Sequence, residues 1–344
     1  MSSQTPAVRS AFPLGTPPSE KHTPRMDPAD APGMTCYRTL AKRLTPPLLR
    51  RRIERQAGLW TKKMHQGTGV FRAGRWIPID DLAAFGLRAA GLWTHAYQQF
   101  LDIETVVIDV PLERLPAAFD GFRLLHLSDL HCDLDLAFTD VLLKKLAEVE
   151  FDFAVLTGDF HNRIGETPTR SLAEMAKILQ PLAGRCVGSL GNHDFVEQVA
   201  FLEAHGMPIL LNENQFIERE GQRLYFCGID DPHFFETHDL RAARAGVPDD
   251  ACTILLSHSP ETWKEAEKWG YDYLLAGHLH GGQLCLPGGI AVIKNAPVPR
   301  SMIAGPFRYG RLRGYTSRGT GSCGIPARLF CPPEMTIHVL RCVN

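Results

Sequence analysis

The chain has 344 residues, and its 37 Lys and Arg nearly balance its 38 Asp and Glu, which leaves a formal net charge of −1 at pH 7. Hydrophobic residues make up 44% of the sequence, so the chain is long and apolar enough to bury one sizeable core. No uninterrupted apolar run reaches the roughly 20 residues of a membrane-spanning helix, which excludes an integral membrane protein of that type.

The first 35 residues differ in composition from the rest of the chain. They carry seven prolines together with many Ser and Thr, and such a segment cannot build a core. Residues 1–35 are therefore expected to form a disordered tail. Residues 1–6 show neither a charged n-region nor an apolar h-region, so no secretory signal is recognised. Nine cysteines without a Cys-x-x-Cys pair favour reduced thiols, and we expect a cytoplasmic protein.

Residues 36–105 are expected to form a basic, mostly helical extension. Between residues 36 and 76 the chain has eleven Lys and Arg against one acid, Glu54. An anionic membrane surface attracts such a block, although a solvated face or a nucleic-acid-binding patch has the same composition. Residues 82–101 then show the spacing of one amphipathic helix, which either packs on the next domain or lies in the membrane plane. Its apolar stripe comprises Leu82, Phe85, Ala89, Leu92, Trp93, Ala96 and Phe100.

Residues 106–344 alternate between strand-like and helix-like segments, and they are expected to form one catalytic domain. This alternation predicts an α/β fold in which helices flank a mixed sheet sandwich. The segment 284–333 is rich in Gly, Pro and Arg, so it is expected to form loops around the site and a late hairpin. Helices are predicted at 136–149, 170–179, 195–205 and 261–269, and strands at 223–229 and 336–340.

Five apolar runs with the character of buried strands lead directly into short polar strings. Ligands of open α/β sheets bind at the carboxyl ends of the strands, so the five strings predict one common site. Each string alone is more often a surface turn, a helix cap or a core histidine. The strings are Asp129-Leu130-His131, Gly158-Asp159, Gly191-Asn192-His193-Asp194, His258 and Gly277-His278-Leu279-His280.

These residue types suit a hydrolytic site with two metal ions. Divalent cations bind carboxylate oxygen, amide oxygen and imidazole nitrogen. Two such ions about 3.5–4 Å apart hold both the attacking and the leaving oxygen of an in-line phosphoryl displacement. Asp159 is the natural bridging ligand, because one carboxylate has two oxygens and its negative charge reduces the repulsion between the cations.

The series of strings resembles the calcineurin-like metallophosphoesterase superfamily. The resemblance implies a four-layer αββα metallophosphoesterase sandwich over residues 106–344, with a mostly helical N-terminal extension. Gly281-Gly282-Gln283 and the segments 314–319 and 332–334 resemble a bacterial branch that contains phosphodiesterases and UDP-2,3-diacylglucosamine hydrolases.

The resemblance also implies roles for individual residues. It implies that His193 does not bind metal but acts as the general acid toward the leaving oxygen. The implied cofactors are two divalent metal ions, with Mn²⁺ favoured over Fe, Zn or Mg. One ion would be held by Asp129, His131, Asp159 and His280, and the other by Asp159, Asn192, His258 and His278.

The sequence departs from the superfamily pattern after Asp159. Where related phosphatases place an acid that pairs with the catalytic histidine, this chain has Asn162. An amide can orient an imidazole but cannot stabilise its cation, and His161 could partly substitute if its ring turned inward. Arg163 matches the phosphate-clamping arginine of the family, although a solvated loop arginine is the alternative. Arg163 and Asn162 are thus the candidate substrate-binding residues.

Three functions are compatible with the sequence. The favoured one is a phosphodiesterase or pyrophosphatase that acts on a membrane-associated nucleotide lipid such as UDP-2,3-diacylglucosamine, in the lipid A pathway. Such an enzyme would bind peripherally to the inner face of the cytoplasmic membrane. The alternative is a nuclease or cyclic-nucleotide phosphodiesterase, in which the basic block would bind nucleic acid. A non-catalytic metal-binding scaffold is the weakest reading, because the ligand set and His193 are complete.

Overall fold

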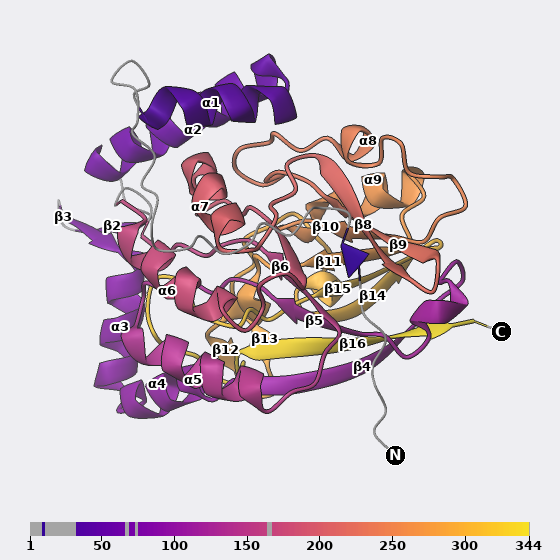
Figure 1. Ribbon diagram of the computed structural model, residues 1–344. Helices are drawn as coiled ribbons and strands as arrows, with labels where there is room; N and C mark the ends of the chain where they lie inside the picture. The colour runs from indigo at the N-terminus through magenta and orange to yellow at the C-terminus, as the bar shows by residue number, and fades with distance from the viewer. Residues whose placement is uncertain (1–8, 11–31, 66–68, 73–74, 164–166, 344) are drawn as a thin grey trace, which may run out of the picture.

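Two β-sheets pack face to face, and helices cover the outer face of each sheet (Figure 1). The computed structural model describes residues 9–10, 32–65, 69–72, 75–163 and 167–343. Buried side chains of both sheets meet between them, as in the stack of Phe153 on Phe226 at 5.2 Å between ring centroids. The four-layer αββα sandwich expected from the sequence is therefore confirmed.

The first sheet has five strands. Three neighbouring strands on one side of the sheet run parallel, and the last strand of the chain pairs antiparallel with the nearest of them and parallel with the edge strand on the other side. Its order is β4 (Glu104–Leu112), β16 (Glu334–Cys342), β5 (Arg123–Leu127), β6 (Phe153–Thr157) and β7 (Cys186–Ser189).

The second sheet has seven strands, of which four neighbours are parallel. Its order is β1 (Arg9–Ser10), β8 (Glu213–Arg219), β9 (Gln222–Gly228), β10 (Thr253–Leu256), β11 (Tyr273–Ala276), β15 (Leu312–Thr316) and β14 (Gly305–Tyr309). The two-stranded ribbons are β2 (Gly69–Arg72) with β3 (Arg75–Pro78), and β12 (Cys285–Leu286) with β13 (Ile290–Ala291).

The parallel strands read as continuous apolar runs because both of their faces are buried. In β6, Phe153 and Val155 face the other sheet, whereas Ala154 and Leu156 face the helices. The outer layers are formed by α5 (Leu136–Ala147), α6 (Thr169–Leu179) and α7 (Val199–Ala204) on the first sheet, and by α8 (Leu240–Ala243) and α9 (Trp263–Lys268) on the second. The single-turn 3-10 helices are Ala117–Phe119, Val196–Gln198, Pro260–Thr262, His280–Gly282 and Arg300–Met302.

The N-terminal extension is helical, but its amphipathic segment is two helices rather than the single predicted one. They are α3 (Ile79–Ala89) and α4 (Trp93–Leu101), and Gly91 between them has a positive φ of 70°. This turn resets the helical phase, so the predicted stripe is wrong over α3. Phe85 is 68% exposed, whereas Ala84 and Leu87 pack against the loop around Ile325.

The basic part of the extension packs on the sheet sandwich through ion pairs. It forms α1 (Pro32–Arg43) and α2 (Pro46–His65), and α2 carries the fully buried Arg52. Much of the block predicted to meet a membrane is thus engaged within the protein. The pairs are Arg43 with Glu203 and Glu213, Arg51 and Arg55 with Glu236, and Arg52 with Asp230.

Two pieces of the segment expected to be disordered have regular structure. Arg9–Ser10 pair with β8, and α1 begins at Pro32. The remainder of residues 1–35 lies outside the described residues. Among the helices that the structure describes, none combines the length and the apolar character needed to cross a bilayer.

Candidate dinuclear metal site

The predicted ligands gather where the carboxyl ends of both sets of parallel strands meet. The first sheet contributes Asp129, Asp159 and Asn192 from the turns after β5, β6 and β7. The second sheet contributes His258 after β10, and His278 and His280 after β11. Two clusters result, in each of which the possible ligand atoms lie within 4.8 Å of one another: Asp129 with His131 and His280, and Asp159 with His258 and His278.

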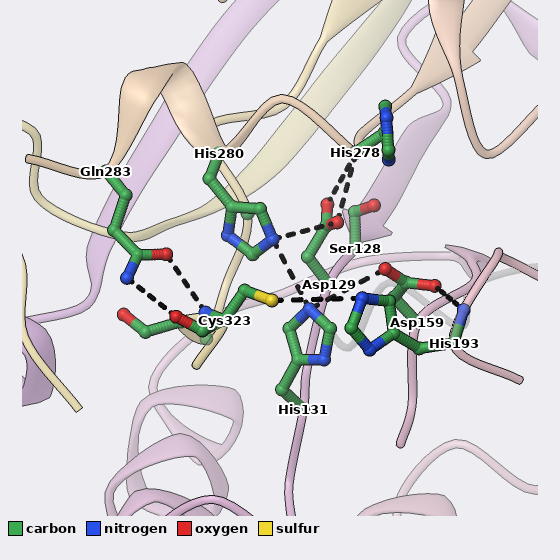
Figure 2. A network of polar contacts seen from close by, with 12 residues as sticks. Ser128, Asp129, His131, Asp159, His193, His278, His280, Gln283 and Cys323 are labelled. Carbon is green, nitrogen blue, oxygen red and sulfur yellow. Dashed lines mark hydrogen bonds and ion pairs between the residues drawn. The ribbon is translucent and has the colours of Figure 1, made fainter. Parts of the chain in front are cut away.

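The Asp159 carboxylate lies between these two clusters. Its Oδ2 is 3.6 Å from Nε2 of His131 in the first cluster and 3.2 Å from Nε2 of His258 in the second. The Asn192 side-chain oxygen is 3.0 Å from the same His258 nitrogen. In the first cluster, Nε2 of His280 is 3.3 Å from Oδ1 of Asp129. Figure 2 marks this contact with a dashed line. This arrangement offers two adjacent cation positions that share one carboxylate.

The backbone at these turns is strained. A positive φ costs a non-glycine residue about 1–2 kcal/mol, because its Cβ approaches the following carbonyl oxygen. Such strain is concentrated at functional sites, where the surrounding structure maintains it. The ligand candidates with positive φ are Asp129 (54°), His131 (40°), Asp159 (58°), His278 (69°) and His280 (50°).

Two glycines of the motifs are required by the close approach of the carboxylates. A Cβ at Gly191 would collide with Oδ1 of Asp159, and a Cβ at Gly277 would collide with Ser128 and Oδ2 of Asp129. The glycines that flank the ligands in the sequence therefore make room for ligands that follow another strand, of the same sheet for Gly191 and of the facing sheet for Gly277.

Backbone carbonyls fix the orientation of two ligand rings. Nδ1 of His131 donates to the carbonyl of His161 at 3.0 Å, and Nδ1 of His258 donates to the carbonyl of Thr157 at 2.8 Å. With the proton on Nδ1, the lone pair of Nε2 is free to bind a cation, as in many metal sites. Nε2 of His278 is buried without a hydrogen-bond partner among the residues that the structure describes.

A buried arginine supports the remaining histidine. Arg328 is fully buried, donates to the backbone carbonyl of His280 at 2.8 Å and places Nη2 3.2 Å from Nδ1 of that ring. Burial and the Arg328 charge together hold the pKa of His280 well below its usual range. His280 is therefore neutral, as a metal ligand must be.

The Asp159 carboxylate shifts the pKa values of two histidines at the site. Burial lowers the pKa of His258, but the charge and hydrogen bond of Asp159 together with the charges of Asp129 and Asp231 outweigh burial and raise this pKa to about 10. Burial likewise lowers the pKa of His193, and Asp159 and Cys323 raise it to about 10. Burial raises the pKa of Asp159, yet the His258 and His193 charges hold it well below its usual range. The proton on His258 thus occupies a position that a cation can take.

His193 and Cys323 form the more accessible edge of the site. Nδ1 of His193 donates to the carbonyl of Asn162 at 2.9 Å, and Nε2 lies 3.8 Å from Sγ of Cys323 (Figure 2). Gln283 fixes Cys323 by accepting from its backbone N–H and donating to its carbonyl, both at 2.9 Å. His131, His193 and Cys323 could also hold a cation, because their ligand atoms lie within 4.8 Å of one another.

Comparison with known proteins places this site in a family. The model of the family described as calcineurin-like phosphoesterase matches residues 122–282. The uncharacterized metallophosphoesterase YkoQ of Bacillus subtilis is 31% identical over 246 residues, which cover 69% of this chain and 89% of that protein. The chain belongs to the calcineurin-like phosphoesterase family. It is a metal-dependent phosphoester hydrolase, as the activities named for related proteins also indicate.

Two further members of the family have lower identity. The uncharacterized metallophosphoesterase YkuE of Bacillus subtilis is 26% identical, and the match covers 76% of this chain and 96% of that protein. The UDP-2,3-diacylglucosamine pyrophosphatase LpxG of Chlamydia trachomatis is 26% identical, with coverages of 66% and 85%.

The family pattern and this chain differ around His193. The backbone carbonyl of Asn162 contacts the His193 ring, whereas the Asn162 side-chain oxygen accepts from the N–H of Gly324 at 2.9 Å. The His161 ring is not turned toward His193: its Nδ1 faces Asp133 at 3.2 Å, and its Nε2 donates to the Arg163 carbonyl. No side-chain carboxylate therefore pairs with Nδ1 of His193 in the part of the chain that the structure describes.

The two predicted substrate-binding residues have different surroundings. Arg163 is exposed and Asn162 is buried beside the site. Asp194, which follows His193, accepts from the backbone N–H groups of Asp159 at 2.7 Å and of Gly191 at 2.9 Å. The Asp194 carboxylate thus holds two of the ligand turns together.

Sequence patterns missed four residues near the site. Cys323 and Arg328 lie in the Gly- and Pro-rich segment, which has no periodicity to place them. Arg52 is one of many arginines in the basic block, and only the fold shows which one is buried. His233 could have been found, because it follows the strand predicted at 223–229 just as the metal-ligand strings follow theirs.

Proposed function

We propose that the chain is a phosphodiesterase or pyrophosphatase with two metal ions that hydrolyses a nucleotide-linked lipid such as UDP-2,3-diacylglucosamine. The proposed setting is the inner, cytoplasmic surface of a membrane, with the protein bound peripherally. Two observations support this function: the chain belongs to a hydrolase family, and an exposed apolar surface lies next to the candidate metal site.

The donor set fits two divalent cations. Imidazole nitrogens, carboxylate oxygens and one amide oxygen suit Mn²⁺, which we propose as the resident metal. The unpartnered Nε2 of the buried His278 supports this assignment, because burying a polar atom without a partner is costly. When bound, the two cations would neutralise charge on the phosphoryl group and lower the pKa of the attacking water. We propose Asp129, His131, Asp159 and His280 for one ion, and Asp159, Asn192, His258 and His278 for the other.

His193 is the proposed general acid. It is half-buried beside the ligand candidates, and its backbone N–H donates to Oδ1 of Asp159 at 2.9 Å, which fixes its position. The Asn162 carbonyl holds the proton on Nδ1, so Nε2 is the nitrogen that protonates the leaving oxygen. Arg163 lies on the same loop as Asn162, and we propose that it binds a phosphoryl oxygen of the substrate.

The observation that carries the lipid assignment is the β12–β13 ribbon. This segment follows His280-Gly281-Gly282-Gln283 directly, and it exposes four large apolar side chains to solvent. The basic residues Lys294 and Arg300 follow the ribbon in the sequence. Their positive charges would favour an anionic lipid surface. Exposed apolar groups that cluster beside a site are typical of contacts with lipid or another apolar partner. The exposed side chains are Leu286, Ile290, Val292 and Ile293.

The experiment compares three substrates that share a scissile phosphate. Mn²⁺-loaded protein is assayed with UDP-2,3-diacylglucosamine in mixed micelles, with UDP-N-acetylglucosamine and with bis-p-nitrophenyl phosphate. The double variant Ile290→Ser/Ile293→Ser should lose at least tenfold in kcat/KM for the acylated substrate only, because each buried side chain contributes about 1.5–3 kcal/mol. Val107→Ser is the matched control, since Val107 is also exposed (55%) but lies on the edge strand β4.

Several results would contradict the lipid assignment. Equal losses on all three substrates would mean that the ribbon supports the fold rather than the lipid. Wild-type preference for cyclic nucleotides or single-stranded DNA would favour the nucleotide phosphodiesterase or nuclease instead.

A further inference from the structure

A second histidine and carboxylate pair lies beside the metal-ligand candidates. The ring of His233 packs on the ring of His278, with 4.1 Å between their centroids and a 46° angle between their planes. Nδ1 of His233 lies 2.7 Å from Oε2 of Glu261, and the same carboxylate oxygen accepts from the Ser259 hydroxyl at 2.8 Å. The pair is connected to the site through His278, but it belongs to neither ligand cluster.

The topology explains why His233 reaches the site. Strand β9 runs parallel to β10, so the turn after β9 emerges at the same edge of the sheet as His258. The loop that carries His233 is also held firmly. The Asp231 carboxylate accepts the backbone N–H groups of His233, Phe234 and Phe235 at 2.7–3.1 Å.

Helix α2 holds the same loop from the other side. The Arg52 guanidinium lies 3.4 Å above the centroid of the Phe235 ring and 3.4 Å from Oδ1 of Asp230, and Arg55 donates to the Phe234 carbonyl. A side chain on a rigid, well-supported loop can act at a defined position, unlike one on a freely moving loop.

The contact with Glu261 leaves one ring nitrogen of His233 for a bound molecule. Nδ1–H of His233 is directed to Glu261, and Nε2 has no hydrogen bond to any residue in the described part of the chain. The His233 side chain is 27% exposed, so this nitrogen is accessible to a bound molecule. Because Glu261 occupies Nδ1, Nε2 is the ring nitrogen that remains for a hydrogen bond to a bound molecule.

We propose that His233 is a substrate-binding residue whose Nε2 makes a hydrogen bond to the phosphoester, on the His278 side of the site. Glu261 is the positioning residue that holds the ring. This role rests on the phosphoester hydrolase activity of the family and is independent of the lipid assignment. The site then has two histidines that belong to neither of the two ligand clusters: His233 with a carboxylate partner and His193 with a backbone carbonyl partner.

The test measures binding of inorganic phosphate, the simplest phosphoryl ligand, to Mn²⁺-loaded protein by calorimetry. His233→Ala should raise the Kd for phosphate by about 10- to 100-fold, the range for a hydrogen bond to a charged group. His233→Gln keeps an N–H donor and should restore part of the affinity. Both variants should retain wild-type metal content and thermal stability.

His238→Ala is the matched control. His238 is equally exposed (27%), lies on the same loop and also approaches a glutamate, with Nε2 3.9 Å from Glu265, but it makes no ring contact with a described metal-ligand candidate. This variant should bind phosphate as the wild type does. Glu261→Gln should fall between the wild type and His233→Ala, because the ring remains but its orientation is less fixed.

Diester hydrolysis supplies a second readout. With bis-p-nitrophenyl phosphate, His233→Ala should raise KM more than it lowers kcat, whereas a merely structural defect would lower metal content or thermal stability. A phosphate Kd and a KM within twofold of the wild type, with intact metal content, would overturn the proposal. If the wild type fails to hydrolyse diesters while His233→Ala still loses phosphate affinity, the activity is wrong and the His233 contact stands.

Discussion

The guanidinium of Arg52 donates a hydrogen bond of 2.8 Å to the backbone carbonyl of Asp194, the residue that follows His193. Through this bond, helix α2 of the N-terminal extension contacts the turn that carries Asn192 and His193. Gln56, one helical turn later, accepts from the N–H of Val196 at 3.0 Å and so holds the same segment. The extension is therefore part of the support of the candidate site rather than a separate appendage.

Removing one partner of the ion pair between Arg52 and Asp230 should destabilise the protein strongly. Both side chains are fully buried, and each variant leaves an uncompensated charge or polar group. Arg52→Met should lower the free energy of unfolding by about 3–5 kcal/mol, measured by chemical denaturation. Adding Asp230→Asn should recover part of this loss, because the remaining partner is then neutral. Strictly additive losses in the double variant would show that the two residues do not interact.

Gly277→Ala should disrupt the first ligand cluster. Its Cβ would collide with Ser128 and with the Asp129 carboxylate, so the strands must separate or Asp129 must turn away. We expect less than half of the wild-type metal content by elemental analysis and a lower melting temperature. Gly86→Ala in α3 is the control, because a Cβ at Gly86 meets nothing within 4 Å and alanine favours helix by about 1 kcal/mol. Normal metal content in Gly277→Ala would refute the steric argument.

His193→Ala should separate proton transfer from metal binding. We expect both metals to remain, with a loss of about 10²–10⁴ in kcat for diesters that have poor leaving groups, the usual range for general acid catalysis. Bis-p-nitrophenyl phosphate needs less protonation and should lose less. Loss of a metal ion from the variant would instead assign His193 to the group that it forms with His131 and Cys323.

Metal affinity should rise with pH. Burial lowers the pKa of His258, but the nearby carboxylates, Asp159 foremost, together outweigh burial and raise it to about 10, so the metal-free protein holds this proton at pH 7.5. A cation must displace it, and each proton released increases the affinity by up to about tenfold per pH unit until the pH exceeds the pKa. Calorimetry with Mn²⁺ at pH 6.5, 7.5 and 8.5, in buffers of different ionisation enthalpy, measures both quantities. An affinity that does not change with pH would show that His258 is already neutral.

The sequence predicts the site better than it predicts the extension, for a physical reason. A buried parallel strand has a distinctive apolar pattern, and its carboxyl end fixes the position of the next residue, so Asp129, Asp159 and His258 could be placed together. Helix α3 illustrates the opposite case. Phe85 and Leu87 are equally plausible on a helical stripe, and only the turn at Gly91 and the packing against Ile325 decide which one is buried.

Long-range pairing limits prediction in the same way. Arg52 and Arg50 have the same local sequence character, yet Arg52 is buried against Asp230 and Asp194 while Arg50 pairs with the nearby Glu54 at the surface. Arg328 supports His280 from 48 residues away, within a segment without periodicity. Such contacts depend on the tertiary fold, which no local pattern encodes.

The central claim is that Asp159 joins two cation positions into one hydrolytic site, and the metal content of Asp159→Asn tests it most directly. Wild-type protein reconstituted with Mn²⁺ should bind two ions per chain and hydrolyse bis-p-nitrophenyl phosphate. Asp159→Asn should bind fewer than one ion and lose at least a hundredfold in kcat/KM, because the bridging charge that holds the two cations close is removed. Asp133→Asn, a buried carboxylate outside both clusters, should keep two ions. Two tightly bound ions and activity within tenfold of the wild type in Asp159→Asn would contradict the account.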